Sequence, residues 1–161
     1  MADTIREKIL KNLVTTLQAV TVANGYNTTF KTVERLVANP IEANLPLPCM
    51  VVHDVDDTDQ TGRDDAGGGA MGFETFRMGM VVEFWMRETS KGSLSSDLNA
   101  ALGDIYKAVT VDWARGAGMP AIDTRYMAAI TVLAQKLEPL GGMQVRFEVD
   151  YRFVYGDPTQ G

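Results

Sequence analysis

Two long segments of the sequence alternate large apolar side chains with other residues at every second position, and this alternation constrains the fold most. From Phe76 to Met86 the even-numbered positions are all large and apolar, and the positions between them include several charged residues. The same period runs from Met143 to Tyr155. Because successive side chains of a strand point to opposite faces of a sheet, each segment predicts a strand with one face in the core.

Three further strands are expected from β-branched, aromatic and apolar runs, at 27–37, 49–53 and 126–137. Segment 54–72, which follows the second of them, is rich in Asp and Gly and poor in large apolar side chains. We therefore expect it to be a long acidic, glycine-rich loop that joins two strands as a hairpin connection. Further connections are predicted at 116–120 and 139–142, where Gly and Pro cluster.

Two segments, 4–22 and 94–109, place apolar residues three and four positions apart and predict amphipathic helices. At the start of the first, Thr4 and Glu7 have the spacing of a capping box, and Gly25 is expected to end the helix. Ser93 and Ser95 are the candidate N-caps of the second helix. The two helices suffice to cover one face of a small sheet.

The predicted order is helix, three strands, helix, two strands, which lacks the alternation of a parallel α/β fold. The sequence thus predicts a single α+β domain over residues 1–161, with two amphipathic helices packed on one face of an antiparallel or mixed sheet of about five strands. The other face would be either a solvated surface laced with ion pairs or a specific polar contact. Its expected residues are Arg77, Glu83, Trp85, Arg87, Arg146, Glu148, Asp150 and Arg152.

The composition argues against several classes of function. The formal net charge is −6, and Lys and Arg are scattered singly, so a nucleic-acid phosphate backbone would be repelled rather than held. The sequence has no apolar stretch that resembles a signal peptide or a membrane span, so we expect neither secretion nor membrane insertion. Cys49 is the single cysteine, which excludes an intramolecular disulfide and predicts folding in a reducing compartment.

Any Ser/His or Cys/His nucleophilic site would have to use His53, the single histidine, which lies four residues after Cys49. On one strand these side chains would share a face but lie about 13 Å apart, far beyond hydrogen-bond reach. This spacing excludes a Cys/His dyad, and no other catalytic arrangement is recognisable. The sequence predicts that the protein is not an enzyme.

The clustered carboxylates of the acidic loop raise the possibility of a metal site, because hard cations bind several carboxylate oxygens. The run from Asp57 to Gly62 matches the opening of an EF-hand loop, but the twelfth position is Gly68, where a bidentate Glu is required. Gly67 to Gly69 lacks the Lys and Ser/Thr ending of a phosphate-binding loop. We therefore expect no metal ion and no cofactor.

Four segments resemble the tail terminator proteins of long-tailed bacteriophages, a family that includes the lambda tail terminator and related neck subunits. Two of them are the charged opening of the first helix and the turn that leads to the first strand. The others are a Leu-Pro step into an apolar strand and the last strand. In this sequence they are Thr4 to Leu10, Asn24 to Thr28, Leu47 to Val52 and Met143 to Arg152.

The resemblance implies a homohexameric ring that sits on the last ring of the tail tube and ends tail polymerisation. Its implied partners are further copies of itself, the tail tube protein and the head-side connector or stopper protein. The implied location is the tail or neck of a virion assembled in the host cytoplasm, without membrane contact and without a catalytic site. DNA would pass through the ring without specific binding, which suits an acidic subunit.

The candidate interface or lumen residues come from the acidic loop and from the uncovered face of the sheet. The hypothesis is that the loop residues line the channel or contact the adjacent ring. Three alternatives stay open: another neck, head-completion or tube-like subunit, a small-ligand-binding α+β domain, and a small hydrolase built from scattered acids. The candidate residues are Asp56, Asp57, Asp59, Arg63, Asp64, Asp65, Arg77, Trp85, Arg87, Arg146 and Arg152.

Overall fold

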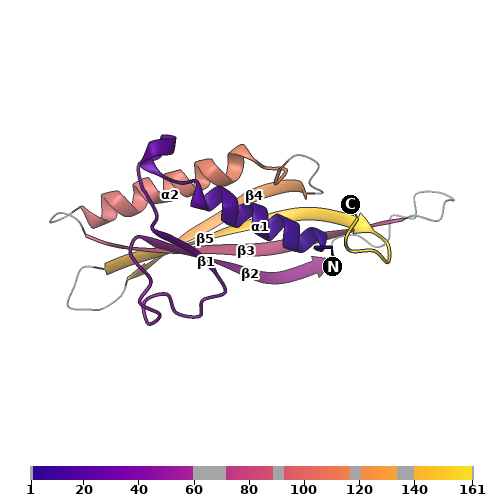
Figure 1. The fold of residues 1–161 in the computed structure, drawn as a ribbon, viewed down its shortest axis with the longest axis horizontal. Helices are drawn as coiled ribbons and strands as arrows, with labels where there is room; N and C mark the ends of the chain where they lie inside the picture. Colours follow the sequence, from indigo (N-terminus) through magenta and orange to yellow (C-terminus); the bar gives the residue numbers. More distant parts are fainter. Residues whose placement is uncertain (1, 60–71, 89–92, 117–120, 134–139, 161) are drawn as a thin grey trace.

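The computed structural model of the protein describes residues 2–59, 72–88, 93–116, 121–133 and 140–160. Figure 1 shows two helices lying against one face of a five-stranded sheet, which confirms the predicted α+β class. The helices are α1 (Ile5–Gln18) and α2 (Leu94–Val111), and a short 3-10 turn, η1 (Val22–Asn24), follows α1. The strands are β1 (Thr32–Arg35), β2 (Cys49–Asp59), β3 (Phe73–Arg87), β4 (Ala121–Leu133) and β5 (Leu140–Val154).

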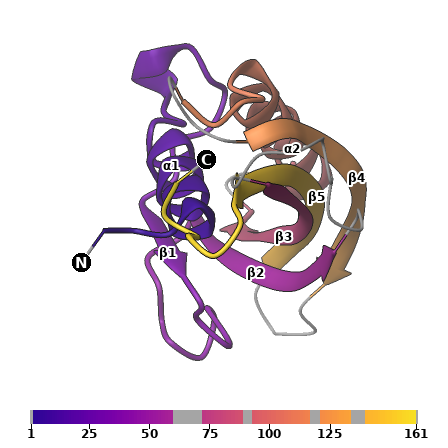
Figure 2. The ribbon, with the colours of Figure 1, turned by 90° about the vertical axis from the view of Figure 1, so that its right-hand side faces the viewer.

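The strands are ordered β1-β2-β3-β5-β4 across the sheet. β1 runs parallel to β2, and every other neighbouring pair is antiparallel, so the sheet is mixed. The two strongly alternating segments, β3 and β5, lie side by side at its centre and pair from Phe73 with Val154 to Arg87 with Leu140. Figure 2 shows the sheet curving, with β4 along one outer edge.

The main core lies between this sheet and the two helices. Leu13 of α1 and Ile105 of α2 pack in one cluster with Met80, Phe84 and Phe147 of the sheet, and all five are fully buried. Each such side chain contributes about 1.5 to 3 kcal/mol by leaving water. The alternation that predicted β3 and β5 therefore corresponds to the helix-covered face.

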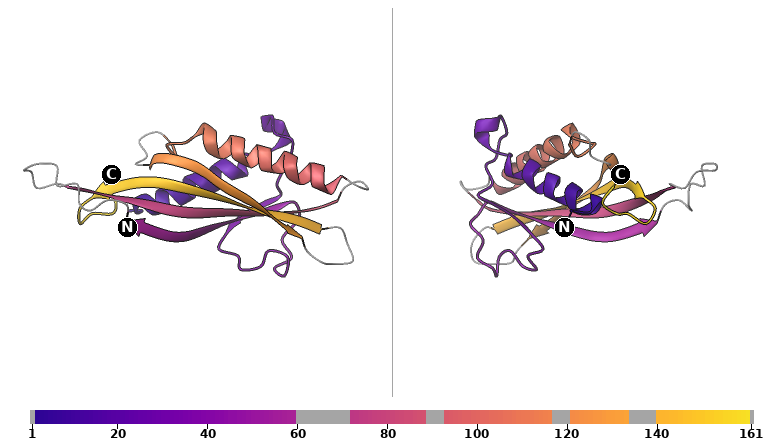
Figure 3. Two further views of the ribbon diagram at one scale, coloured as in Figure 1. Left: turned by 180° about the vertical axis from the view of Figure 1, so that it is seen from behind. Right: turned by 45° about the vertical axis from the view of Figure 1, so that its right-hand side comes forward.

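A second, smaller apolar cluster lies on the other face of the sheet. Cys49, Trp85 and Leu140 are buried there, and Leu45 and Leu47 of the segment before β2 pack against them. Figure 3 shows that this segment crosses the side of the sheet opposite α2. Trp85 was expected on an exposed face and is 7% exposed, so that expectation is wrong. The remainder of this helix-free side is called the open face below.

Several predicted boundaries are wrong. α1 ends at Gln18, and Gly25, with φ of 81°, ends η1 instead of the helix. β1 is only four residues long, because the segment before it is bonded to α2 rather than to a strand. β4 (Ala121–Leu133) begins five residues earlier than predicted, and its predicted last residues, 134–137, lie outside the described residues.

The first residues of the acidic segment 54–72 are strand and not loop. β2 continues through residues 54–59, and its ladder with β3 extends to the pair Asp59 and Phe76. The expected loop therefore starts at least six residues later than predicted, and 60–71 lie outside the described residues. The hairpin between β2 and β3 is confirmed.

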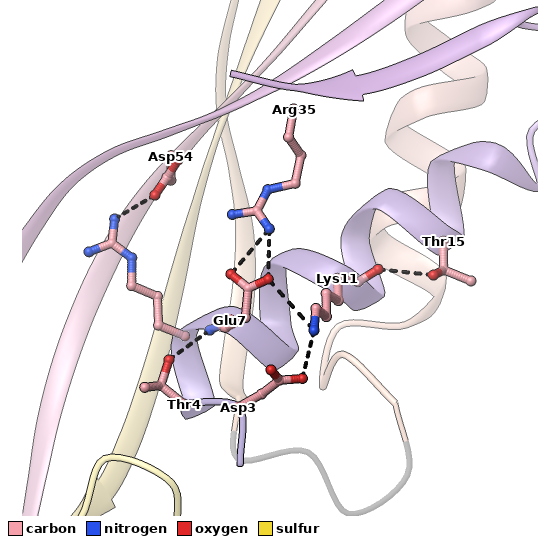
Figure 4. A network of polar contacts seen from close by, with 8 residues as sticks. Asp3, Thr4, Glu7, Lys11, Thr15, Arg35 and Asp54 are labelled. Carbon is pink, nitrogen blue, oxygen red and sulfur yellow. Dashed lines mark hydrogen bonds and ion pairs between the residues drawn. The ribbon is translucent and has the colours of Figure 1, made fainter. Parts of the chain in front are cut away.

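The start of α1 anchors the helix to the sheet (Figure 4). The Glu7 backbone N–H donates to the Thr4 hydroxyl at 3.2 Å, as the capping box predicts. The Glu7 carboxylate, however, accepts from Arg35 of β1 at 2.9 and 3.1 Å instead of completing the box. At α2, Ser93 is the N-cap, but its side chain makes no capping hydrogen bond with the helix N–H groups; its hydroxyl donates to the Asp97 carboxylate at 2.9 Å. Neither helix in the described part of the chain is long and apolar enough to span a membrane.

Candidate assembly surface

A network of ion pairs crosses the centre of the open face. Arg77 of β3 lies opposite Asp150 of β5 and donates to both of its carboxylate oxygens, at 2.7 and 3.1 Å. The hydrogen bond with Asp150 raises the pKa of Arg77 above its ordinary value. Arg125 of β4 also donates to Asp150, and it donates to Asp123 at 2.7 Å. The charges of these side chains are therefore paired with one another within the subunit.

The other candidate arginines are spread along the same face. Arg152 lies with its guanidinium 4.7 Å from the centre of the Phe73 ring, a cation–π distance. Arg146 is exposed near the middle of β5, and Arg87 is exposed at the far end of β3. The structure thus brings Arg77 into a paired network but does not gather the arginines into one basic site.

Glu83 is the centre of a second polar group on the open face. It accepts from the Trp85 indole at 2.5 Å and from the Gln144 amide at 3.0 Å, and its Oε2 lies 3.8 Å from His53 Nε2. Cys49 lies on the same strand as His53, but its thiol is buried in the smaller apolar cluster. Burial raises the pKa of Cys49 to about 11, which makes this thiol a poor nucleophile at neutral pH.

The acidic candidates divide between β2 and the segment after it. The backbones of Asp57 and Asp59 pair with Met78 and Phe76 of β3, so the EF-hand-like run does not begin as a loop. Asp56 lies at the bulge of the same strand, between the paired residues Asp54 and Asp57. Arg63, Asp64 and Asp65 lie outside the described residues. Within the described ranges, no three His, Cys, Asp or Glu residues are grouped to hold a metal ion.

The most exposed apolar strand is β4, which sequence reasoning did not single out. It is 13 residues long and forms one edge of the sheet. Ile122, Met127 and Ile130 are 44%, 47% and 63% exposed. Ile122 and Met127 each occupy a bulge in the ladder with β5 and so have no residue opposite them. Bulges redirect side chains, and here both redirected side chains are large and apolar.

Aromatic residues from α2 and the segment after it extend this surface. Tyr106 of α2 is 48% exposed and packs edge-on against Tyr126 of β4, with ring centres 5.5 Å apart. Trp113 is 55% exposed, and its carbonyl accepts from the Thr124 hydroxyl at 2.7 Å. We call the following set the β4 patch: Tyr106, Trp113, Ile122, Tyr126 and Met127.

The composition of the β4 patch is that of an interface. Tyr, Trp and Met are enriched where proteins bind one another, and long apolar edge strands are rare in proteins that remain single. A sequence signal for the patch exists: 121–133 has large apolar residues without the strict alternation seen in β3. Such a pattern fits a strand at an edge, where neither face needs to be fully buried.

Comparison with known proteins finds similarity among solved structures only. No protein-family model and no curated protein matches the chain. Among solved structures, the chain is similar to a chain of the virion of a native gene transfer agent particle, with a TM-score of 0.45 and 13% identity. The alignment covers 89% of this chain and 91% of that one.

Proposed function

We propose that the protein is a structural subunit of a phage-like virion, and specifically a tail terminator. In this role it forms a ring, expected to be a hexamer, on the end of the tail tube. The ring stops tail polymerisation and offers a docking surface to the head-side connector or stopper. The role requires no bond-making chemistry, so we also propose that the protein is not an enzyme.

The observation that carries the proposal is the β4 patch on an unprotected edge strand. Soluble proteins usually protect long edge strands with Pro, Lys or a covering element, because bare backbone groups recruit further strands. β4 contains neither Pro nor Lys, no strand in the described ranges pairs with its outer side, and two of its exposed apolar side chains stand at bulges. Such an edge suits a subunit whose final state is an assembly.

The proposal for the tail end in particular rests on the sequence. The four segments that resemble tail terminators include the first part of α1, the entry to β2 and most of β5. A net charge of −6 also suits a ring through which DNA must slide, because like charges prevent adhesion. A neck subunit of another kind is the main alternative and would share both the acidity and the edge.

Tube growth in vitro tests the terminator role. The purified protein is added to the tail-tube protein of the same particle during polymerisation, and tube length is measured by negative-stain microscopy. We expect short tubes that carry extra density at one end and do not resume growth when fresh tube protein is added. Normal tube growth without end-binding, together with binding to the head-side connector, would instead support the alternative neck subunit.

The role of the acidic residues is tested separately. Asp56, Asp57, Asp59, Asp64 and Asp65 are replaced together by Asn, which removes five negative charges with little change in side-chain size. If these residues line the channel or contact the adjacent ring, tail length or head joining becomes abnormal. Normal tail length and normal joining would contradict this part of the proposal.

A further inference from the structure

The two edges of the sheet differ in how they are protected. β1 is four residues long, and Arg35 at its end is bound by Glu7 of α1. β4 is 13 residues long, and its two charged side chains, Asp123 and Arg125, bind one another at 2.7 Å. Charges that are already paired offer little resistance to an incoming strand. The β1 edge of the sheet is therefore largely protected from further strand pairing, whereas the β4 edge is open to it.

The shield at the β1 edge is incomplete. β1 pairs with β2 only from Cys49 to Val52, so no strand in the described ranges covers the outer side of β2 from His53 to Asp59. Arg6 of α1 reaches this stretch, where it donates to Asp54 at 3.1 Å and to the Val55 carbonyl at 3.4 Å. The latter distance is long for a hydrogen bond, so an incoming backbone N–H could replace it at small cost.

The uncovered part of β2 and the part of β4 that carries the β4 patch lie at the same position along the strand direction, on opposite sides of the sheet. The strand order makes β4 antiparallel to β2, because three successive antiparallel steps separate them. Successive residue pairs across the sheet place Ala128 of β4 level with His53 of β2, by way of Val81 and Arg146. In the same way, Thr124 of β4 is level with Asp57 of β2, by way of Met78 and Val149.

We propose that β4 of one copy pairs with the outer edge of β2 of the next copy, as an antiparallel strand beside His53 to Asp59. The proposal rests on the ring-forming function proposed above. It identifies the contact between neighbouring subunits of the ring, which we call the seam. Copies related by rotation about an axis along the strands would meet in this register over Ile122 to Ala128. From Ala129 onward β4 lies level with β1, so that part of the strand must pass outside β1. Because the two edges differ, the contact is head-to-tail and generates a closed ring or an open helix rather than a twofold dimer.

The seam accounts for features that the isolated subunit leaves without a role. The β4 patch becomes covered on the helix side by the neighbouring subunit, and the backbone groups of both edges gain partners. Arg6 gives up the Val55 carbonyl and keeps Asp54. The open face continues from subunit to subunit as one sheet surface.

Engineered disulfides test the seam in the full chain. His53→Cys is combined in turn with Ala128→Cys, Ile130→Cys and Arg125→Cys, which lie on the same face and allow for a small slide in register. Within one subunit, His53 and Ala128 are three strand spacings apart, about 14 Å, so any disulfide must join two copies. The matched control combines His53→Cys with Arg146→Cys, at the same height but on the central strand β5.

The oxidised samples are analysed without reductant by gel electrophoresis, alone at high concentration and with the tail-tube protein, beside light scattering. We expect a ladder of covalent multimers for at least one β4 combination and none for the control. Dimers from a single β4 cysteine would indicate β4 pairing with itself and would overturn the seam. Oligomers in scattering without any ladder would overturn the seam but leave the proposed function. A monomer under both conditions would overturn both.

Discussion

Asp104 of α2 holds Asn27 with three hydrogen bonds, two from the Asn27 backbone N–H and one from its side-chain amide, at 2.9 to 3.1 Å. The Asp104 carboxylate also accepts from the Thr28 N–H at 2.8 Å. Asp104 is 2% exposed, whereas Asn27 itself is exposed, so the bonds tie a surface segment to a buried carboxylate. They fix the chain before β1 against α2, and they explain why β1 starts later than its sequence predicts.

Asp104→Ala should lower the free energy of unfolding by about 1 to 3 kcal/mol, because it removes the acceptor of the Asn27 and Thr28 backbone N–H groups. Urea denaturation monitored by circular dichroism measures the loss. Asn99→Ala is the matched control, since Asn99 is exposed on the same helix and should be neutral or slightly stabilising. Equal stability of Asp104→Ala and the wild-type protein would contradict the role assigned to Asp104.

Gly142→Ala should destabilise the protein, whereas Gly103→Ala should stabilise it. A methyl group at Gly142 would come within 2.6 Å of both the Phe84 carbonyl and the Trp85 ring. At Gly103, inside α2, nothing lies within 4 Å of the added atom. We expect a loss of about 1 to 3 kcal/mol at the first position and a gain of about 0.5 to 1 kcal/mol at the second. Thermal denaturation of the two variants in one buffer checks the opposite signs.

Met127→Lys should weaken self-association without weakening the fold. Met127 is 47% exposed at a bulge of β4, so a charge there faces water in the monomer and is buried in the proposed seam. We expect association to weaken at least about tenfold, measured by sedimentation or light scattering across a concentration series. Val22→Lys, which changes a 60% exposed residue on η1, serves as the control. Equal loss in both variants would argue for a nonspecific effect of charge.

The stability of the protein should fall between about pH 9 and pH 11 through Cys49. Burial raises the pKa of this thiol from 9.0 to about 11, so the unfolded chain releases the proton at a lower pH than the folded one. Ionisation then favours the unfolded state across this interval, and the thiol's contribution is fully present only below it. Cys49→Ala removes the group, so the difference in unfolding free energy between this variant and the wild-type protein should depend on pH only in that window. Parallel curves through pH 11 would refute the assignment.

The sequence predicted the parts of the fold that depend on local periodicity. β3 and β5 were found within a few residues, because their even or odd positions all face the helices and must be apolar. α2 was predicted at 94–109 and ends two residues later, at Val111. In these elements one face is buried along its whole length, so the spacing of apolar residues in the sequence directly indicates the type of element and its buried face.

The parts that were missed depend on contacts between distant segments. Residues 54–59 have the composition of a loop, but β3 provides a ladder that extends β2 through them. Trp85 was assigned to an exposed face, and it is buried because Leu45 and Leu47 fold over it from the segment before β2. β4 lacks a strict period because it lies at an edge and contains two bulges. The β4 patch was therefore not foreseen, although all its residues are visible in the sequence.

The two tryptophans of the chain stand in contrasting surroundings, with Trp85 at 7% and Trp113 at 55% exposure. Indole fluorescence shifts to shorter wavelength when water is removed from around the ring. The fluorescence of Trp113, beside β4, should thus change in intensity or wavelength when neighbouring subunits bind. The fluorescence of Trp85 should change only when the smaller apolar cluster around Cys49 unfolds. The protein thereby contains its own optical probes for distinguishing assembly from unfolding, without any added label.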